Sequence, residues 1–202
     1  NSAFVFCSFN NSYKISPQEF KIWMRLLKKV NHSVLWLFKS NKWMEINLRK
    51  QAQLYGIDGS RIIFADMLDH AKHLARFKCA DLFLDTFNYN AHTTASDALW
   101  SCIPVVTKQG KQFSARVAAS LLNAIGLPEL ITQNEKEYEE LILKIALNPK
   151  TLESIKNKLK NNRLIKPLFD TKRYTKNFEK ALINAHKLYL NFGKTENFKI
   201  KD

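Results

Sequence analysis

Residues 3–30 read AFVFCSFNNSYKISPQEFKIWMRLLKKV, and this stretch joins a short apolar run to an amphipathic helix through a polar loop at residues 10–14. The tetrapeptide Ser16-Pro17-Gln18-Glu19 predicts a capping box with proline at the first helical position. The helix has one apolar face, because large apolar residues recur at three- and four-residue spacings, at Phe20, Trp23, Met24, Leu27 and Val30. The stretch therefore predicts a strand, a loop and a helix in that order.

The same alternation of apolar runs and helical periodicity continues outward to about residue 133. Strands are predicted at residues 3–9, 34–39, 61–65, 81–86 and 103–107. Helices are predicted between them at residues 17–30, 42–55 and 69–77, from Thr93 onward, and at 113–126. Continuous apolar strands that alternate with helices are typical of a parallel sheet covered on both faces. We therefore predict the α/β class, with a doubly wound, Rossmann-like parallel sheet.

After Pro128 the periodicity is helical only, with helices predicted at residues 134–147, 151–163 and 172–191. These helices either pack on the edge of the sheet or reach to another domain. We expect a Rossmann-like core at residues 1–133, C-terminal helices that pack on the same domain at 134–191, and a polar tail at 192–202. The chain has 202 residues, of which 46% are hydrophobic, and this is sufficient for one sizeable core.

Apolar runs in this sequence are too short to cross a membrane, which takes roughly 20 residues. No basic region followed by an apolar core precedes the first strand, so no export signal is visible. The cysteines, Cys7, Cys79 and Cys102, are far apart in apolar surroundings. They predict buried thiols in a reducing compartment rather than disulfides or a zinc site. The predicted location is therefore cytoplasmic, and no membrane partner is expected.

The formal net charge is +14, and it is unevenly distributed. Residues 143–202 contain 15 Lys/Arg and 5 Asp/Glu, so most of the excess belongs to the C-terminal helices. There Lys156 and Lys160 alternate with Ile155 and Leu159, which favours a solvated basic face over a buried apolar one. A nucleic-acid-binding surface is the alternative interpretation, and nucleic acid is the less favoured partner.

Ligands of an open parallel sheet bind beyond the carboxyl ends of its strands, so the loops after the strands are the candidate site. Three polar loops follow predicted strands, at residues 10–14, 69–76 and 88–97. The chain has only five glycines and contains neither a GxGxxG motif nor a GxxxxGK(S/T) motif. Dinucleotide-dependent oxidoreductases and P-loop nucleotide hydrolases are therefore disfavoured.

The third of these loops leads into a helix that begins at Thr93-Thr94, and a helix N-terminus with two hydroxyls can hold a phosphate. Lys14 from the first loop can add a positive charge to the same anion. Asp97, one turn into the helix, can accept hydrogen bonds from the hydroxyls of a ribose. The alternative is structural, because Thr94-Ala95-Ser96-Asp97 also has the spacing of a capping box.

His70, His73 and Arg76 share one helical face, because they are three residues apart. A metal site is one interpretation, but His92 is the only further candidate ligand nearby in the sequence and no HExxH motif is present. A histidine that stacks on a nucleotide base, with an arginine beside it, is the interpretation we favour. No metal and no other cofactor is expected.

Eight short motifs follow one another along the chain: CSFNNSYKI at 7–15, SVLWL at 33–37, RIIF at 61–64, ADLFLDT at 80–86, NAHTTASDALW at 90–100, RVAAS at 116–120, EYE at 137–139 and PLFDT at 167–171. In this order they resemble the C-terminal catalytic lobe of O-linked N-acetylglucosamine transferases and SPINDLY-like glycosyltransferases, which form glycosyltransferase family 41. The resemblance extends to about Leu190.

The resemblance implies a GT-B glycosyltransferase whose C-terminal lobe, this chain, binds a nucleotide-sugar donor without a metal ion. The implied reaction transfers N-acetylglucosamine from UDP-N-acetylglucosamine to Ser/Thr hydroxyls. The alternatives are transfer of fucose from a GDP sugar, and a non-catalytic basic domain that binds nucleic acid or another partner. We expect the family's N-terminal lobe, which helps to bind the protein acceptor, to lie outside these 202 residues. This chain alone is therefore expected to bind donor and to transfer little or no sugar.

The match implies donor contacts at Asn11, Lys14, His70, His73, Arg76, His92, Thr93, Thr94 and Asp97. Lys14 is the implied catalytic residue, because it neutralises the departing diphosphate. The match also implies that Thr93 and Thr94 hold phosphate oxygens at the helix start and that Asp97 binds the ribose.

Histidines and an arginine take the remaining implied roles. His73 lies against the base with Arg76 near its edge, and His92 lies beside the sugar or the phosphates. Asn11 stands where the family usually has glutamine, and His70 stands where animal members have lysine. These two departures affect the residues that are implied to contact the sugar and the diphosphate.

Overall fold

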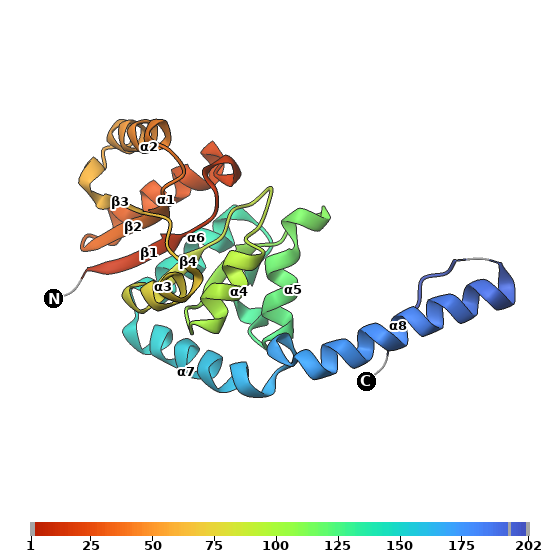
Figure 1. The fold of residues 1–202 in the computed structure, drawn as a ribbon. Coiled ribbons are helices and arrows are strands. Elements are labelled where there is room, and N and C mark those ends of the chain that lie inside the picture. The colour runs from red at the N-terminus through yellow and green to blue at the C-terminus, as the bar shows by residue number, and fades with distance from the viewer. Residues whose placement is uncertain (1–2, 194, 201–202) are drawn as a thin grey trace.

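The strand and helix segments fold into a six-stranded parallel sheet flanked by helices, shown in Figure 1 for the computed structural model. The structure describes residues 3–193 and 195–200. The strands are β1 Phe4–Ser8, β2 Ser33–Phe38, β3 Ile62–Ala65, β4 Leu82–Leu84, β5 Val105–Lys108 and β6 Ile131–Thr132. The first five match predicted strands and confirm the doubly wound sheet. The sixth was not predicted, because two residues are too few for a periodicity.

The strand order is β3-β2-β1-β4-β5-β6, so the chain changes its direction of winding between β1 and β4. These two strands are neighbours, with Phe6 beside Leu82 and Cys7 beside Phe83. The loops that leave their carboxyl ends therefore start side by side. This is the topological switch point at which ligands of such sheets bind.

The helices lie where the alternation predicts them, with one exception. They are α1 Pro17–Lys29, α2 Lys42–Leu54, α3 His70–Arg76, α4 Thr93–Trp100, α5 Val117–Ala124, α6 Glu135–Ala146, α7 Pro149–Ile165 and α8 Thr171–Phe192. The exception is the helix predicted at 113–126, because Phe113–Ala115 forms a separate 3-10 turn. Gly110 donates to the carbonyl of Ala115 at 2.7 Å, and a Cβ at Gly110 would lie 2.5 Å from the Cβ of Ala115. The chain turns back here, which only glycine permits.

The capping box predicted at the start of α1 is formed, and the backbone N–H of Ser16 donates to Glu19 Oε1 at 2.8 Å. The apolar face of α1 is buried against the sheet, with Trp23 at its centre. Trp23 Nε1 donates to the hydroxyl of Tyr138 on α6 at 3.3 Å, and that hydroxyl donates to the carbonyl of Asp85 at 3.0 Å. This chain of hydrogen bonds ties two helices to the residue that follows β4.

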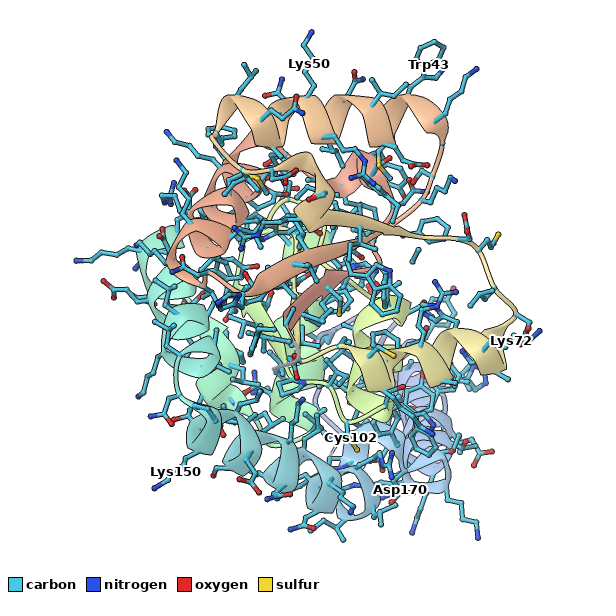
Figure 2. The ribbon with its side chains drawn as sticks, turned by 90° about the vertical axis from the view of Figure 1, so that its left-hand side faces the viewer. Trp43, Lys50, Lys72, Cys102, Lys150 and Asp170 are labelled. Atoms are coloured by element: carbon cyan, nitrogen blue, oxygen red, sulfur yellow. The ribbon has the colours of Figure 1, made fainter. Side chains whose placement is uncertain are left out.

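Surface helices are two-sided, as their sequence pattern predicts. On α2, Met44 and Ala52 are buried, whereas Figure 2 shows Trp43 and Lys50 pointing away from the body of the molecule. Lys150 at the start of α7 points outward in the same view, and Leu159 of that helix is fully buried. The basic side chains of these helices therefore form a solvated face over an apolar one.

The last helix, α8, differs from the others because none of its 22 residues is buried. Figure 1 shows it as an arm that extends away from the sheet, whereas α6 lies against α1 and β5, and α7 lies against α6 and α4. The prediction that all C-terminal helices pack on the domain is therefore wrong for α8. Of the predicted tail, Phe192 still belongs to α8, and residues 194, 201 and 202 lie outside the described residues.

The three cysteines are free, but only Cys7 is fully buried. Burial raises the pKa of the Cys7 thiol far above its usual range. The prediction of a buried thiol is wrong for Cys79, which is exposed, and Cys102 is partly exposed. Cys79 borders an open apolar hollow of about 510 Å³ beside Trp36 and Ile63, where the face of the sheet is left open.

No helix in the described part of the chain is long and apolar enough to span a membrane.

Candidate functional site

A cavity of about 510 Å³ lies where the loops after β1, β3 and β4 meet. Eight of the nine predicted site residues line it: Asn11, Lys14, His70, His73, Arg76, His92, Thr93 and Thr94. The ninth, Asp97, pairs with two of the histidines in this wall. The three polar loops of the sequence thus form one site, because β1 and β4 are neighbours in the sheet.

The N-terminus of α4 forms one wall of the cavity. His92 occupies the N-cap position, and its side chain makes no capping hydrogen bond. The Thr94 hydroxyl instead donates to Asn10 Oδ1 at 2.8 Å, across the site. The capping-box interpretation of Thr94–Asp97 is therefore wrong. With no side-chain cap, the N–H groups of the first turn are available to an anion.

Lys14 reaches the cavity from a 3-10 turn, Ser12–Lys14, in the loop after β1. Its Nζ donates to the carbonyl of Asn90 at 3.1 Å and lies 3.9 Å from the centroid of the Tyr89 ring. Burial lowers the pKa of Lys14, and the charge of the nearby Asp85 opposes that shift. The ammonium group is thus held at the cavity wall by the loop after β4.

Asp85 follows β4, is fully buried, and holds this loop from behind. Its carboxylate accepts hydrogen bonds from Thr107 Oγ1 at 2.6 Å, from the N–H of Ala91 at 2.6 Å and from the N–H of Thr86 at 2.8 Å. Burial nevertheless raises the pKa of Asp85 to about 7, although these hydrogen bonds and the charge of Lys14 lower it. Sequence reasoning missed this residue as part of the site. The signal was an acidic residue directly after an apolar strand.

His73 and Asp97 form a second polar group, on α3 and α4. His73 Nε2 lies 3.7 Å from Asp97 Oδ2, and His70 Nε2 lies 3.4 Å from Asp97 Oδ1. The His73 ring packs edge-on against Phe9 and Phe77, with centroids 5.4 and 5.2 Å away. Burial lowers the pKa of His73, as does the charge of Arg76, and Asp97 opposes both. The neutral imidazole is therefore favoured, which suits stacking on an aromatic base.

The other predicted residues are held by backbone or polar partners. Arg76 is buried, and its Nη1 donates to the carbonyl of Asp66 at 2.9 Å, while its Nε has no hydrogen-bond partner among the described residues. His92 Nε2 lies 3.3 Å from the carbonyl of Ser114. Asn11 Oδ1 accepts from the Ser40 hydroxyl at 3.2 Å. These contacts fix the side chains from outside the cavity.

Several apolar and aromatic residues of the cavity were not predicted as site residues. They are Phe9, Tyr13, Phe38, Met67, Leu68 and Tyr89. Met67 and Leu68 are exposed although they are apolar. Their position in the loop between β3 and α3 was the available signal. An apolar wall beside a few polar groups is typical of small-molecule sites.

The three histidines considered as metal ligands, His70, His73 and His92, are not brought together. His70 and His73 share Asp97, but His92 lies in a different contact, against the rings of Tyr89 and Phe113. Within residues 3–193 and 195–200, no group of three or more His, Cys, Asp or Glu residues is placed to hold a metal ion.

Comparisons with known proteins agree with the fold. The profile described as "Glycosyl transferase family 41" matches residues 1–178. A probable UDP-N-acetylglucosamine–peptide N-acetylglucosaminyltransferase, SEC, from Arabidopsis thaliana is 36% identical over 198 residues, which cover 98% of this chain and 20% of that protein. A UDP-N-acetylglucosamine–peptide N-acetylglucosaminyltransferase from Caenorhabditis elegans is 35% identical over 189 residues, which cover 94% of this chain and 16% of that protein.

A solved structure of the Thermobaculum terrenum O-GlcNAc transferase, mutant K341M, superposes with a TM-score of 0.85 at 26% sequence identity. The superposition covers 90% of this chain and 36% of the Thermobaculum terrenum chain, so this chain has the fold of one lobe of that longer enzyme. The chain spans about a fifth of the length of the curated relatives that it matches. On the profile match, these identities and the shared fold, the chain belongs to glycosyl transferase family 41, and its fold is the Rossmann-like lobe of a GT-B enzyme.

Proposed function

We propose that this chain is the donor-binding lobe of a protein O-glycosyltransferase that transfers N-acetylglucosamine from UDP-N-acetylglucosamine to Ser/Thr hydroxyls. One observation carries the proposal: an uncapped helix N-terminus, a lysine and a histidine–aspartate pair surround a single cavity at the switch point of the sheet. These groups suit a nucleoside diphosphate, since its phosphates are anionic and its base is aromatic. The relatives named for UDP-N-acetylglucosamine support the choice of donor.

In this proposal the diphosphate lies at the start of α4. Thr93, Thr94 and the first N–H groups of the helix hold its oxygens, and Lys14 neutralises its charge. Asn11 and His70 border the same region and complete the contacts to the diphosphate and the sugar. The arrangement stabilises the charge that develops on the leaving group, so no metal ion is required.

The nucleoside lies further along α3. The base packs against His73 with Arg76 at its edge, and the ribose hydroxyls donate to Asp97. His92, at the N-cap of α4, lies beside the sugar or the phosphates. Because Asp97 pairs with His70 and His73, the histidines orient the carboxylate that receives the ribose.

The reaction is a displacement at the anomeric carbon. The acceptor hydroxyl oxygen forms a bond to that carbon and loses its proton to solvent, and the bond to the diphosphate oxygen breaks with its electron pair leaving on UDP. Lys14 stabilises that charge as it appears. A further lobe of the enzyme supplies the acceptor site, so the 202-residue chain binds donor and transfers little or no sugar. A cytoplasmic location belongs to the same proposal.

Titration calorimetry with UDP, UDP-N-acetylglucosamine, GDP and single-stranded DNA at low and high salt tests the proposal. We expect uridine-selective binding. In a thermal-unfolding measurement, UDP at 100 times its dissociation constant adds about 2.7 kcal/mol to the free energy of unfolding, which raises the melting temperature by about 5–10 °C. Lys14→Ala removes a charge-assisted contact worth about 1.5–3 kcal/mol, so the Kd for UDP rises at least tenfold. Asp97→Asn raises the Kd for UDP and the Kd for uridine by a similar factor.

Other outcomes overturn the proposal in defined ways. Guanosine-selective binding would assign the lobe to a GDP sugar such as GDP-fucose. Salt-sensitive binding of DNA without any nucleotide binding would assign the function to the basic surface. Robust sugar transfer to a peptide by the purified 202-residue chain would disprove the requirement for a second lobe.

A further inference from the structure

The ammonium group of Lys14 is held by an aromatic ring rather than by a carboxylate. Its Nζ lies 3.9 Å from the centroid of the Tyr89 ring, within the range of a cation–π contact. The carbonyl of the next residue, Asn90, accepts its hydrogen bond at 3.1 Å. No ion pair to Lys14 is formed within the described part of the chain. The position of the Lys14 ammonium is therefore fixed without a direct ion pair, although the charge of the buried Asp85 also acts on it.

The loop that carries Tyr89 is fixed at its base. The carbonyl of Tyr89 accepts from the Thr86 hydroxyl at 2.6 Å, and Asn90 Nδ2 donates to the carbonyl of Thr86 at 2.7 Å. Asp85 holds the same loop through the N–H groups of Thr86 and Ala91. The position of the Tyr89 ring is thus set by a buried anchor, although the ring is 40% exposed.

The ring also faces the N-terminus of α4. The Tyr89 and His92 rings have centroids 4.9 Å apart, and His92 is the residue at which α4 begins. The ring of Tyr13, next to Lys14, also lies near Tyr89, with a centroid distance of 6.5 Å. Tyr89 therefore contacts both the lysine and the first residue of the helix start that the proposed function assigns to the diphosphate.

We propose that Tyr89 is a positioning residue for Lys14: its ring holds the ammonium beside the start of α4, where the donor's diphosphate binds. A free lysine side chain has four rotatable bonds, and ordering it on binding costs free energy. A carboxylate partner would also order it, but it would compete with the anionic ligand. A ring orders the cation and leaves its charge for the phosphate. This inference rests on the proposed function.

The test is a double-mutant cycle with two ligands, UDP and uridine, measured by titration calorimetry on the 202-residue chain. Tyr89→Leu removes the ring, and we expect the Kd for UDP to rise about 3- to 10-fold, in the range of one cation–π contact. The Kd for uridine, which lacks phosphates, stays within twofold. In a Lys14→Ala background, Tyr89→Leu changes the Kd for UDP by less than twofold.

Two matched variants complete the experiment. Tyr89→Phe keeps the ring and restores most of the affinity lost in Tyr89→Leu. Tyr174→Leu makes the Leu substitution at an exposed tyrosine of α8, 67% exposed, and leaves the Kd for UDP unchanged. Melting temperatures show that each variant is folded.

The outcomes separate this inference from the proposed function. Two results would overturn the role of Tyr89 and leave the donor site in place. In the first, Tyr89→Leu weakens the binding of UDP and of uridine by the same factor. In the second, Tyr89→Leu raises the Kd for UDP as much in the Lys14→Ala background as in the wild type. A wild-type chain that binds neither UDP nor GDP would overturn the proposed function, and this inference with it.

Discussion

The cavity at the carboxyl edge of the sheet and the arm α8 both expose aromatic side chains on a basic chain, but they are held in different ways. Tyr89 contacts Lys14 from a loop whose base is tied to the buried Asp85. On α8, Tyr174 and Phe178 are 67% and 51% exposed, and no residue of the helix is buried. Exposure and charge therefore do not mark a site by themselves. The difference lies in anchoring, because groups fixed before binding lose little freedom on binding.

Local interactions are the main support of α8. Asp170 caps it by accepting from the N–H of Arg173 at 3.0 Å, and the rings of Tyr174 and Phe178 stack with centroids 6.0 Å apart. An isolated helix gains little stability from such contacts, since most helical stability in proteins comes from packing of an apolar face. The cavity, in contrast, shares its anchor with the core. The comparison predicts large effects of substitutions behind the cavity and small effects on α8.

The largest effect is expected from Asp85→Ala, which breaks the anchor. The substitution leaves Thr107 Oγ1 and the buried N–H groups of Thr86 and Ala91 without their acceptor, at a cost of about 3 kcal/mol or more. The melting temperature falls by about 6–12 °C, measured by circular dichroism. UDP binding weakens as well, because the loop that holds Lys14 is released.

Asp85→Asn is the matched control for this prediction. Its amide oxygen still accepts from both N–H groups, so a smaller loss of stability is expected. An Asp85→Ala variant as stable as the wild type would show that the cavity loop is held no better than α8.

The next effect is a dependence of stability on pH. Burial raises the pKa of Asp85 from 3.8 to about 7, so between these values the folded state binds this proton more tightly than the unfolded state. The contribution of Asp85 to the free energy of unfolding is therefore greatest below about pH 4 and falls as the pH rises toward 7. Urea denaturation of wild type and Asp85→Asn from pH 4 to 8 measures it. The unfolding free energy of the wild type minus that of Asp85→Asn should fall as the pH rises from 4 to 7. A difference that stays constant would contradict the raised pKa of Asp85.

The smallest effect is expected on α8. Tyr174→Ser and Phe178→Ser remove exposed rings, so the melting temperature changes by less than about 2 °C, in line with surface substitutions. The Kd for UDP stays within twofold of wild type. A large loss of stability or of UDP affinity would show that α8 is coupled to the cavity, and the distinction between the two regions would fail.

Much of the fold was predictable because local rules decide it. The capping box at Ser16–Glu19 and the apolar face of α1 follow from spacing alone, and both are formed. The loops after β1, β3 and β4 were predicted as candidates because topology places strand ends at one edge. Prediction failed where long-range contacts decide: the helix predicted from residue 113 is interrupted by the contact between Gly110 and Ala115.

The sequence by itself determined the alternation of strands and helices, the family motifs and the polar residues of the three loops, because these depend on the residues and their spacing. Only the tertiary structure decided that Asp85 supports the loop after β4, that Lys14 lies on Tyr89 and that Asp97 pairs with the histidines of α3. It also decided that Cys79 and α8 are exposed. Partners such as Lys14 and Tyr89 are 75 positions apart, and their contact exists only because the sheet places β1 beside β4.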